Sequence, residues 1–148
     1  MSAGSGVTHS EFNHSHDEPV HFLQIWIVPA ISGAEPRYQQ ANFTAEEKRG
    51  RLKLIISPDG KDGSLHIRQD ARVYAGLFDG NESATLKLPA NRNAYVHVAR
   101  GSVELNGLKL EEGDGVRLRQ EQLIELSKGS DAEVLVFDLR PHELPGLA

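Results

Sequence analysis

Between residues 52 and 139 the chain alternates short apolar runs with glycine-containing turn signals, and this pattern limits the possible folds more than any other feature. Asp-Gly and Asn-Gly pairs tolerate the positive φ angles that tight hairpin turns need. They occur at Asp59-Gly60, Asp62-Gly63, Asp79-Gly80 and Asn106-Gly107, and Gly113-Asp114-Gly115 is a further turn signal. Many short strands at even spacing, with little helix, are typical of a β-sandwich or a closed barrel. We predict an all-β barrel.

The apolar runs between the turns predict the individual strands. We expect strands at about 52–57, 64–69, 72–78, 84–88, 94–99, 102–105, 115–118, 123–126 and 133–139. Another is predicted at 21–28, where β-branched and aromatic residues continue up to Pro29. A short helix is predicted at 44–49, because Thr44 and Glu47 have the spacing of a capping box and Gly50 can end the helix. The tail from residue 140 onward is expected to be irregular.

Histidines and carboxylates gather near the start of the chain, at His9, Glu11, His14, His16 and His21. The chain has no cysteine, and imidazole and carboxylate groups are then the natural ligands of Fe, Mn, Ni, Cu and Zn. Residues two apart in an extended strand face the same side, so His9 and Glu11 can reach one metal ion. A solvated, mobile terminus is an equal alternative, because catalytic sites usually need at least three protein ligands. From spacing alone both interpretations stay open.

The first thirteen residues, MSAGSGVTHSEFN, resemble the pirin-family segment that reads M-S-A-G-x-G-hydrophobic-x-H-S-E-aromatic-N. The similarity continues at 23–29, 36–38, 54–65, 69–70 and 134–139 and so extends over nearly the whole chain. Pirin-family proteins are bicupins, with two β-barrels in one chain. The resemblance implies an all-β, cupin-type (jelly-roll) barrel with extra N-terminal strands and one or two short helices at most. It divides the chain into residual strands of an N-terminal cupin barrel (1–40) and a C-terminal cupin barrel (41–148).

The same resemblance implies a metal site of which this chain carries half. In the family, three histidines and one glutamate hold the metal in the N-terminal barrel, and His9 and Glu11 match the later two of these ligands. The other two lie in a His-x-His motif upstream of the M-S-A-G segment, whereas this chain begins at Met1 and its own His14-Ser15-His16 comes after the segment. A divalent transition metal is implied, with Fe the first choice and Mn, Ni, Cu or Zn as alternatives. Glu11 would be both a ligand and a catalytic base.

Two further histidines, His66 and His97, stand alone in predicted strands. A lone strand histidine is more often a hydrogen-bonded wall residue than a ligand, and the C-terminal barrel is therefore expected to be metal-free.

Three hypotheses for function follow. The first is a quercetin 2,3-dioxygenase-like oxidoreductase that acts on a flavonol-like small molecule; the others are a non-catalytic binding or regulatory module and a truncated homologue without activity. Pirin itself is regarded as an iron-binding cofactor of transcription regulators. Without an N-terminal barrel, the apolar residues of 22–27 would be exposed on an open edge. We therefore expect a homo-oligomer or a partner chain that covers the N-terminal strands.

Charge and composition argue against several other classes. The net charge is −5 and the basic residues are dispersed, so direct nucleic-acid binding is not expected. The most apolar run, 22–31, is too short to cross a bilayer. The absence of cysteine and of a secretory signal favours a cytoplasmic location.

Overall fold

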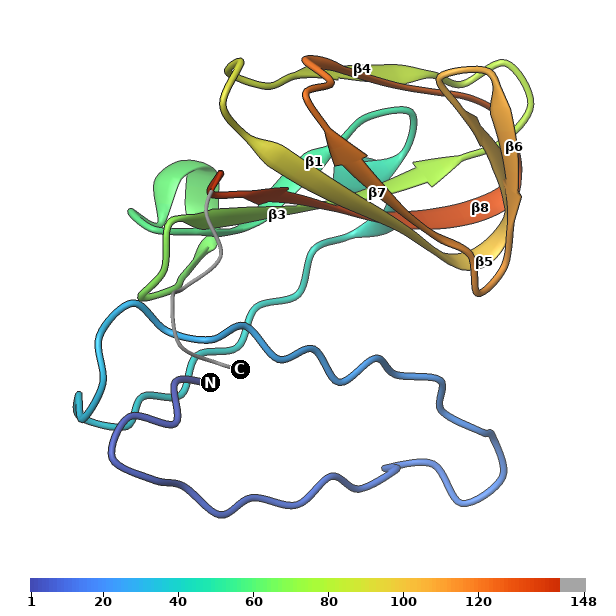
Figure 1. Ribbon diagram of the computed structural model, residues 1–148. Helices are drawn as coiled ribbons and strands as arrows, with labels where there is room; N and C mark the ends of the chain where they lie inside the picture. The colour runs from blue at the N-terminus through green and yellow to red at the C-terminus, as the bar shows by residue number, and fades with distance from the viewer. Residues whose placement is uncertain (142–148) are drawn as a thin grey trace.

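Strands form most of the barrel, and a long N-terminal arm precedes it (Figure 1). The structure, a computed structural model, describes residues 1–141. Residues 142–148, the end of the predicted C-terminal barrel and tail, lie outside the described residues. The helical elements are α1 (Ala45–Lys48) and the 3-10 turn η1 (Lys61–Gly63). The strands are β1 (Lys53–Ser57), β2 (Leu65–His66), β3 (Ala71–Phe78), β4 (Ala84–Lys87), β5 (Asn93–Leu105), β6 (Leu108–Glu111), β7 (Gly115–Arg119) and β8 (Leu123–Leu139). The all-β prediction is confirmed.

The two longest strands, β5 and β8, pair antiparallel and organise the barrel. Their ladder runs from Asn93 opposite Leu139 to Leu105 opposite Leu126, and its register shifts between Val98 and Glu104. Both strands bend there, so each contributes to two layers. The first layer has the order β2-β1-β3-β8-β5-β7, and the second consists of β4, β8, β5 and β6.

Glycine makes the shared bend possible. Gly101 has a φ of +71°, and a Cβ on it would run into the backbone carbonyls of Ser130 and Asp131 on β8. The separate strands predicted at 94–99 and 102–105, and at 123–126 and 133–139, are therefore wrong as separate elements. Each pair is one bent strand, because both partners bend at the same place and the ladder continues through the bend.

The core lies between the two layers. Alternate residues of β5 and β8, together with residues of β3, β6 and β7 and the residue that follows β4, point inward and are buried: Phe78, Leu88, Ala94, Val96, Val98, Val103, Leu105, Leu110, Leu118, Ile124, Leu126, Ala132, Val134 and Val136. Full burial of one such aliphatic side chain contributes roughly 1.5–3 kcal/mol.

The short helix α1 forms as predicted. The Glu47 amide donates to Thr44 Oγ1 over 3.3 Å, and the Thr44 amide donates to Glu47 Oε2 over 2.8 Å, which completes the capping box. That second hydrogen bond is the main reason why the pKa of Glu47 lies below its usual value. Within residues 1–141, no helix has the length and apolar character needed to cross a membrane.

A polar loop joins β1 to β2. The buried Ser57 hydroxyl donates to Asp59 Oδ1 over 2.8 Å, and the Lys61 amide donates to Ser57 Oγ over 3.2 Å. Ser64 Oγ lies 2.7 Å from Ser57 Oγ and donates to the Lys61 carbonyl over 2.6 Å. The hydrogen bonds from Ser57 and from the Lys61 amide lower the pKa of Asp59. The loop is thus held by its own side chains.

The strands expected within residues 1–40 are not formed. Residues 21–28 are extended but belong to no strand, and the only β-type pairing of the arm in residues 1–141 is an isolated bridge between Ser2 and Arg37. A β-branched run becomes a strand only where a neighbouring chain satisfies its backbone hydrogen bonds. The predicted strand at 21–28 is therefore wrong for this structure, because no ladder partner lies beside it.

Candidate functional site

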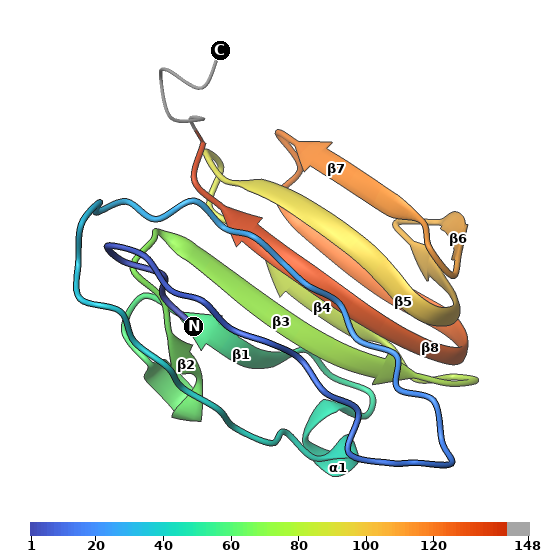
Figure 2. The ribbon, with the colours of Figure 1, turned by 90° about the horizontal axis from the view of Figure 1, so that it is seen from below.

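The N-terminal arm, defined here as residues 1–43, carries the histidine and carboxylate cluster and closes on itself at its base. The Ser2 amide donates to the Arg37 carbonyl over 2.7 Å, and the Arg37 amide donates back to Ser2 over 3.0 Å. The Ser5 amide donates to the Ala34 carbonyl over 3.0 Å. Residues 6–33 consequently form a long loop that runs along the outer face of the sheet (Figures 1 and 2).

Backbone and side-chain hydrogen bonds attach the second half of the arm to the β2–β3 region. Gln69 Nε2 donates to the Val28 carbonyl over 2.7 Å, and the Ala30 amide donates to the Arg68 carbonyl over 2.9 Å. The Gln39 side chain bonds both backbone groups of His66, at 3.0 and 3.1 Å. These contacts hold residues 28–39 against the barrel and carry the preceding residues across the face of β3, β8 and β5 (Figure 2).

His9 and Glu11, the predicted ligands, do converge. His9 Nδ1 lies 3.4 Å from Glu11 Oε1, and the two side chains are 36% and 59% exposed. The N···O edge of a tetrahedral site with metal–ligand bonds of 2.0–2.1 Å is about 3.3 Å. The spacing of the two atoms therefore suits two ligands of one metal ion, although it also suits a simple His–Glu contact.

Two of the three other histidines of the arm lie in a turn, and the third, His21, follows that turn. The Glu18 amide donates to Ser15 Oγ over 2.9 Å, and Asn13 Nδ2 donates to the Glu18 carbonyl over 2.7 Å. This turn contains His14 and His16. Within residues 1–141, no group of three or more His, Cys, Asp or Glu side chains is placed to hold a metal ion. His9 and Glu11 alone do not make a complete donor set in the described part of the chain.

The two barrel histidines differ in their surroundings. His97 lies on β5 and lines a groove described below. His66 lies on β2, where its backbone is bonded to Gln39, but its buried Nδ1 has no hydrogen-bond partner among the described residues. The expectation of a fully hydrogen-bonded wall residue is therefore not met for His66.

A groove of about 430 Å³ lies between the arm and the outer face of the sheet. The tilted rings of Tyr95 and Phe137, 5.9 Å apart between centroids, lie on its sheet side, and His97 and Gln24 supply polar groups. Trp26, 88% exposed, lies on its arm side. Its lining is Leu23, Gln24, Ile25, Trp26, Ile27, Tyr95, His97, Leu135, Phe137 and Leu139. Sequence analysis missed it, because the arm and the sheet face are far apart in sequence.

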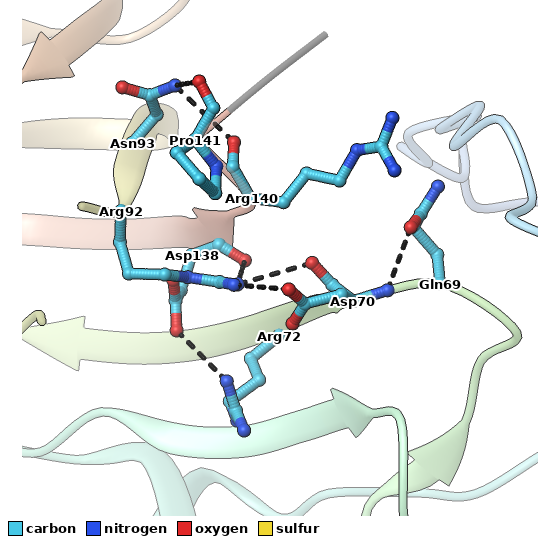
Figure 3. A network of polar contacts seen from close by, with 8 residues as sticks. All are labelled: Gln69, Asp70, Arg72, Arg92, Asn93, Asp138, Arg140 and Pro141. Carbon is cyan, nitrogen blue, oxygen red and sulfur yellow. Dashed lines mark hydrogen bonds and ion pairs between the residues drawn. The ribbon is translucent and has the colours of Figure 1, made fainter. Parts of the chain in front are cut away.

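A buried ionic network anchors the strands near the groove (Figure 3). Arg92, 8% exposed, donates from Nε to Asp138 Oδ1 and from Nη1 to Asp70 Oδ2, both over 2.6 Å. Arg72 Nη1 reaches Asp138 Oδ2 over 3.4 Å. Burial alone would lower the pKa of Arg92, but the bonds to Asp138 and Asp70 outweigh it and the pKa rises. The network fixes the ends of β3, β5 and β8, and no local sequence signal marks it.

Two segments of the chain match models of known protein families. The family model described as "Quercetinase C-terminal cupin domain" matches residues 54–139, and the model described as "Pirin" matches residues 1–27. The quercetin 2,3-dioxygenase of Escherichia coli K12 is 41% identical over 141 residues, which are 95% of this chain and 60% of that protein. The pirin-like protein of Caulobacter vibrioides is 34% identical over 139 residues, covering 93% and 60% of the two chains. The chain thus spans about 60% of the length of these curated relatives.

Solved structures agree with these matches. Escherichia coli YhhW superposes with a TM-score of 0.73 and 37% identity, over 80% of this chain and 50% of that one. Its complex with nickel(II), described as a bacterial pirin, gives a TM-score of 0.72 and 38% identity, over 79% and 49% of the two chains.

Proposed function

The chain belongs to the pirin family of cupin proteins. We propose that it is part of a metal-dependent, quercetin 2,3-dioxygenase-like oxygenase, to which it contributes His9 and Glu11 as metal ligands. The matches confirm the predicted family and the all-β cupin fold. The observation that carries the proposal is the 3.4 Å approach of His9 Nδ1 and Glu11 Oε1, within the segment that matches the pirin model.

Within residues 1–141, no group of three or more candidate ligands is placed to hold a metal ion. The proposed sources of the further ligands are a partner chain or second copy, His14, His16 or His21, or residues of the family's N-terminal barrel that this sequence does not include. The nickel(II) complex of the relative supports a divalent metal; Fe remains our first choice, with Mn, Ni, Cu or Zn as alternatives. By family resemblance, Glu11 would also be the proton acceptor for a flavonol-like substrate.

The domain division and the covering partner belong to the same proposal. Residues 1–40 would be part of an N-terminal cupin barrel, and residues 41–148 would form the C-terminal barrel. Large apolar side chains of the arm are exposed, among them Phe12 at 89% and Phe22 at 56%. This exposure supports the proposal that a partner chain or a second copy packs against the arm. The cysteine-free composition supports a cytoplasmic location.

Metal analysis of the untagged chain tests this function. After anaerobic reconstitution with Fe²⁺, elemental analysis should find bound metal that His9→Ala and Glu11→Ala each abolish, while His14→Ala, in the neighbouring turn, retains it. Flavonol consumption and oxygen uptake should then follow metal content across the variants. Metal binding that survives both ligand substitutions would overturn the assignment of His9 and Glu11.

A second candidate function, a binding module, is favoured by the groove under the arm. Its volume falls in the usual range for small-molecule sites, about 300–1,000 Å³, and such sites are mostly apolar with a few polar groups. The groove fits this description, with Tyr95, Phe137 and Trp26 as aromatic surfaces and His97 as a polar group. A flat aromatic molecule of flavonol type suits this lining without any metal.

Fluorescence of Trp26, the only tryptophan in the chain, tests the second candidate directly. Titration with a flavonol in the presence of EDTA should change the emission saturably. Tyr95→Ala should weaken binding, whereas Leu108→Ala, at an exposed position on β6, should not. An unsaturable signal, or one that is equal in both variants, would exclude the groove as a binding site.

A further inference from the structure

We propose that the groove under the arm takes an aromatic carboxylate, and that Arg117 on β7 recognises the negative charge of this ligand. The inference rests on the second candidate function, the binding module, because it takes the groove to be a ligand site. It adds the chemical class of the ligand and the residue that selects it.

Arg117 lies on the same face of the sheet as the aromatic side of the groove. It is directly opposite Tyr95 in the ladder between β5 and β7, and Tyr95 is directly opposite Phe137 in the ladder between β5 and β8. Directly opposed side chains point to the same face, with Cβ atoms about 4.5–5.5 Å apart. Arg119, the next outward residue of β7, is opposite Asn93, which does not line the groove. Arg117 is therefore the β7 arginine that flanks the groove lining.

The positive charge of Arg117 is not balanced by a contacting group in the described part of the chain. Its side chain is exposed and takes part in no hydrogen bond, ion pair or ring contact within residues 1–141. Among the described residues that line the groove, none is an Asp or a Glu, and the polar side chains are those of Gln24, Tyr95 and His97. A negatively charged ligand group thus meets a cation beside the groove and no carboxylate in its lining.

The hydroxyl of Tyr95 is a second polar group at the same border of the groove. Gly115 on β7 lies opposite His97, and a Cβ on Gly115 would run into the Tyr95 hydroxyl oxygen. The ring of Tyr95 therefore leans toward β7, where the glycine leaves space for the hydroxyl. This hydroxyl makes no hydrogen bond within residues 1–141. A hydroxyl and a guanidinium on neighbouring residues suit a carboxylate, because both donate hydrogen bonds and the charged donor makes the stronger ones.

The rest of the groove suits a planar ring system. The rings of Tyr95 and Phe137 lie on the sheet side, the exposed Trp26 lies on the arm side, and the volume is about 430 Å³. Aromatic rings pack favourably against one another in tilted or offset arrangements. A ligand with its rings between the arm and the sheet and its carboxylate toward β7 satisfies both the apolar lining and Arg117.

Two probes of the same shape test the recognition of charge: 2-naphthoate and 2-naphthamide, in which a neutral carboxamide replaces the carboxylate. Each probe is titrated calorimetrically into the untagged chain in low-salt buffer with EDTA. We expect naphthoate to bind about fivefold more tightly, the upper range for an exposed ion pair, and this preference should fall as salt is added. Arg117→Gln should remove the preference by weakening naphthoate alone, Arg117→Lys should keep part of it, and Tyr95→Ala should weaken both probes.

Arg49→Gln is the matched control, because it also removes one positive charge. Arg49 follows α1 directly, and α1 lies on the opposite side of β3 from β7 (Figure 2). This variant should leave the affinities for both probes unchanged. Circular dichroism of each variant confirms that the barrel is intact.

The outcomes separate this inference from the function on which it rests. Equal affinities for the two probes in the unmodified chain would overturn the recognition of charge but leave the groove as an aromatic binding site. A preference for naphthoate that persists in Arg117→Gln, or that Arg49→Gln removes equally, would overturn the assignment to Arg117. If neither probe binds saturably, or if Tyr95→Ala leaves both affinities unchanged, the inference and the binding-module function both fail.

Discussion

Replacement of Arg92 by alanine is expected to be among the most damaging single changes to the barrel. Asp138, whose side chain is 5% exposed, would lose the guanidinium at 2.6 Å and keep only Arg72 at 3.4 Å. Removing one partner of a buried ion pair costs about 3–5 kcal/mol, because the other charge stays buried without compensation. Since Arg72 remains, the lower end, about 3 kcal/mol of unfolding free energy, is expected for Arg92→Ala.

Urea unfolding followed by circular dichroism measures this loss. With a denaturant slope of about 2 kcal/mol/M, a loss of about 3 kcal/mol lowers the midpoint by about 1.5 M. The thermal midpoint should fall by about 6–12 °C for a chain of this size.

Asp70→Asn is the matched control, because the Asp70 side chain is 56% exposed although it also contacts Arg92 at 2.6 Å. An exposed pair contributes about 1 kcal/mol or less. The double variant Arg92→Met/Asp138→Leu should lose less than Arg92→Ala alone, because no buried charge is left unpaired. If Arg92→Ala and Asp70→Asn cost the same, burial would not be what makes the network important, and the reasoning would be refuted.

Three further predictions concern the bend, the core and the β1–β2 loop. Gly101→Ala should destabilise the barrel by about 3 kcal/mol or more, since it adds a steric clash to the conformational cost of about 1 kcal/mol. Gly80 has a φ of +60° and open space around it, so Gly80→Ala should show the conformational cost alone in the same urea assay. Ile124→Ala, at a fully buried position, should cost about 2–5 kcal/mol, and an equal loss in Leu123→Ala, at a 40% exposed position, would contradict the assigned faces of β8. Because the pKa of Asp59 is lower in the folded protein than its usual 3.8, its contribution to stability should be complete above that pH and lost as the pH falls through the folded pKa. Asp59→Asn should flatten this part of the pH–stability curve, and an unchanged curve would show that the loop hydrogen bonds do not favour the ionised form.

Much of the barrel could be predicted from local sequence, because hairpin turns and strands are local features. Asn106 and Gly107 adopt φ angles of +49° and +82° at the turn between β5 and β6, as the pair predicts. The strand that follows, β6, was nevertheless missed, because its leucines alternate with Lys109 and Glu111 and it contains no apolar run. The capping box of Thr44 and Glu47 was found because its two residues are three positions apart.

The candidate site was predicted only in part, for a related reason. His9 and Glu11 are two residues apart, so their convergence at 3.4 Å involves only neighbouring residues. The groove required the arm to lie across β5 and β8, and the Arg92–Asp138 bond joins residues 46 positions apart in sequence. No local pattern specifies which distant surfaces will meet.

The amino-acid sequence by itself determined the all-β class, the turns and the pirin-type motif that contains His9 and Glu11. All of these depend on residue type and on spacings of a few residues. Only the tertiary structure decided that β5 and β8 are each one bent strand, that residues 21–28 form no strand, and that Arg92 is buried. Each of these depends on a partner that is distant in the chain: a strand needs a second strand to complete its hydrogen bonds, and a buried charge needs a counter-charge that only folding brings beside it.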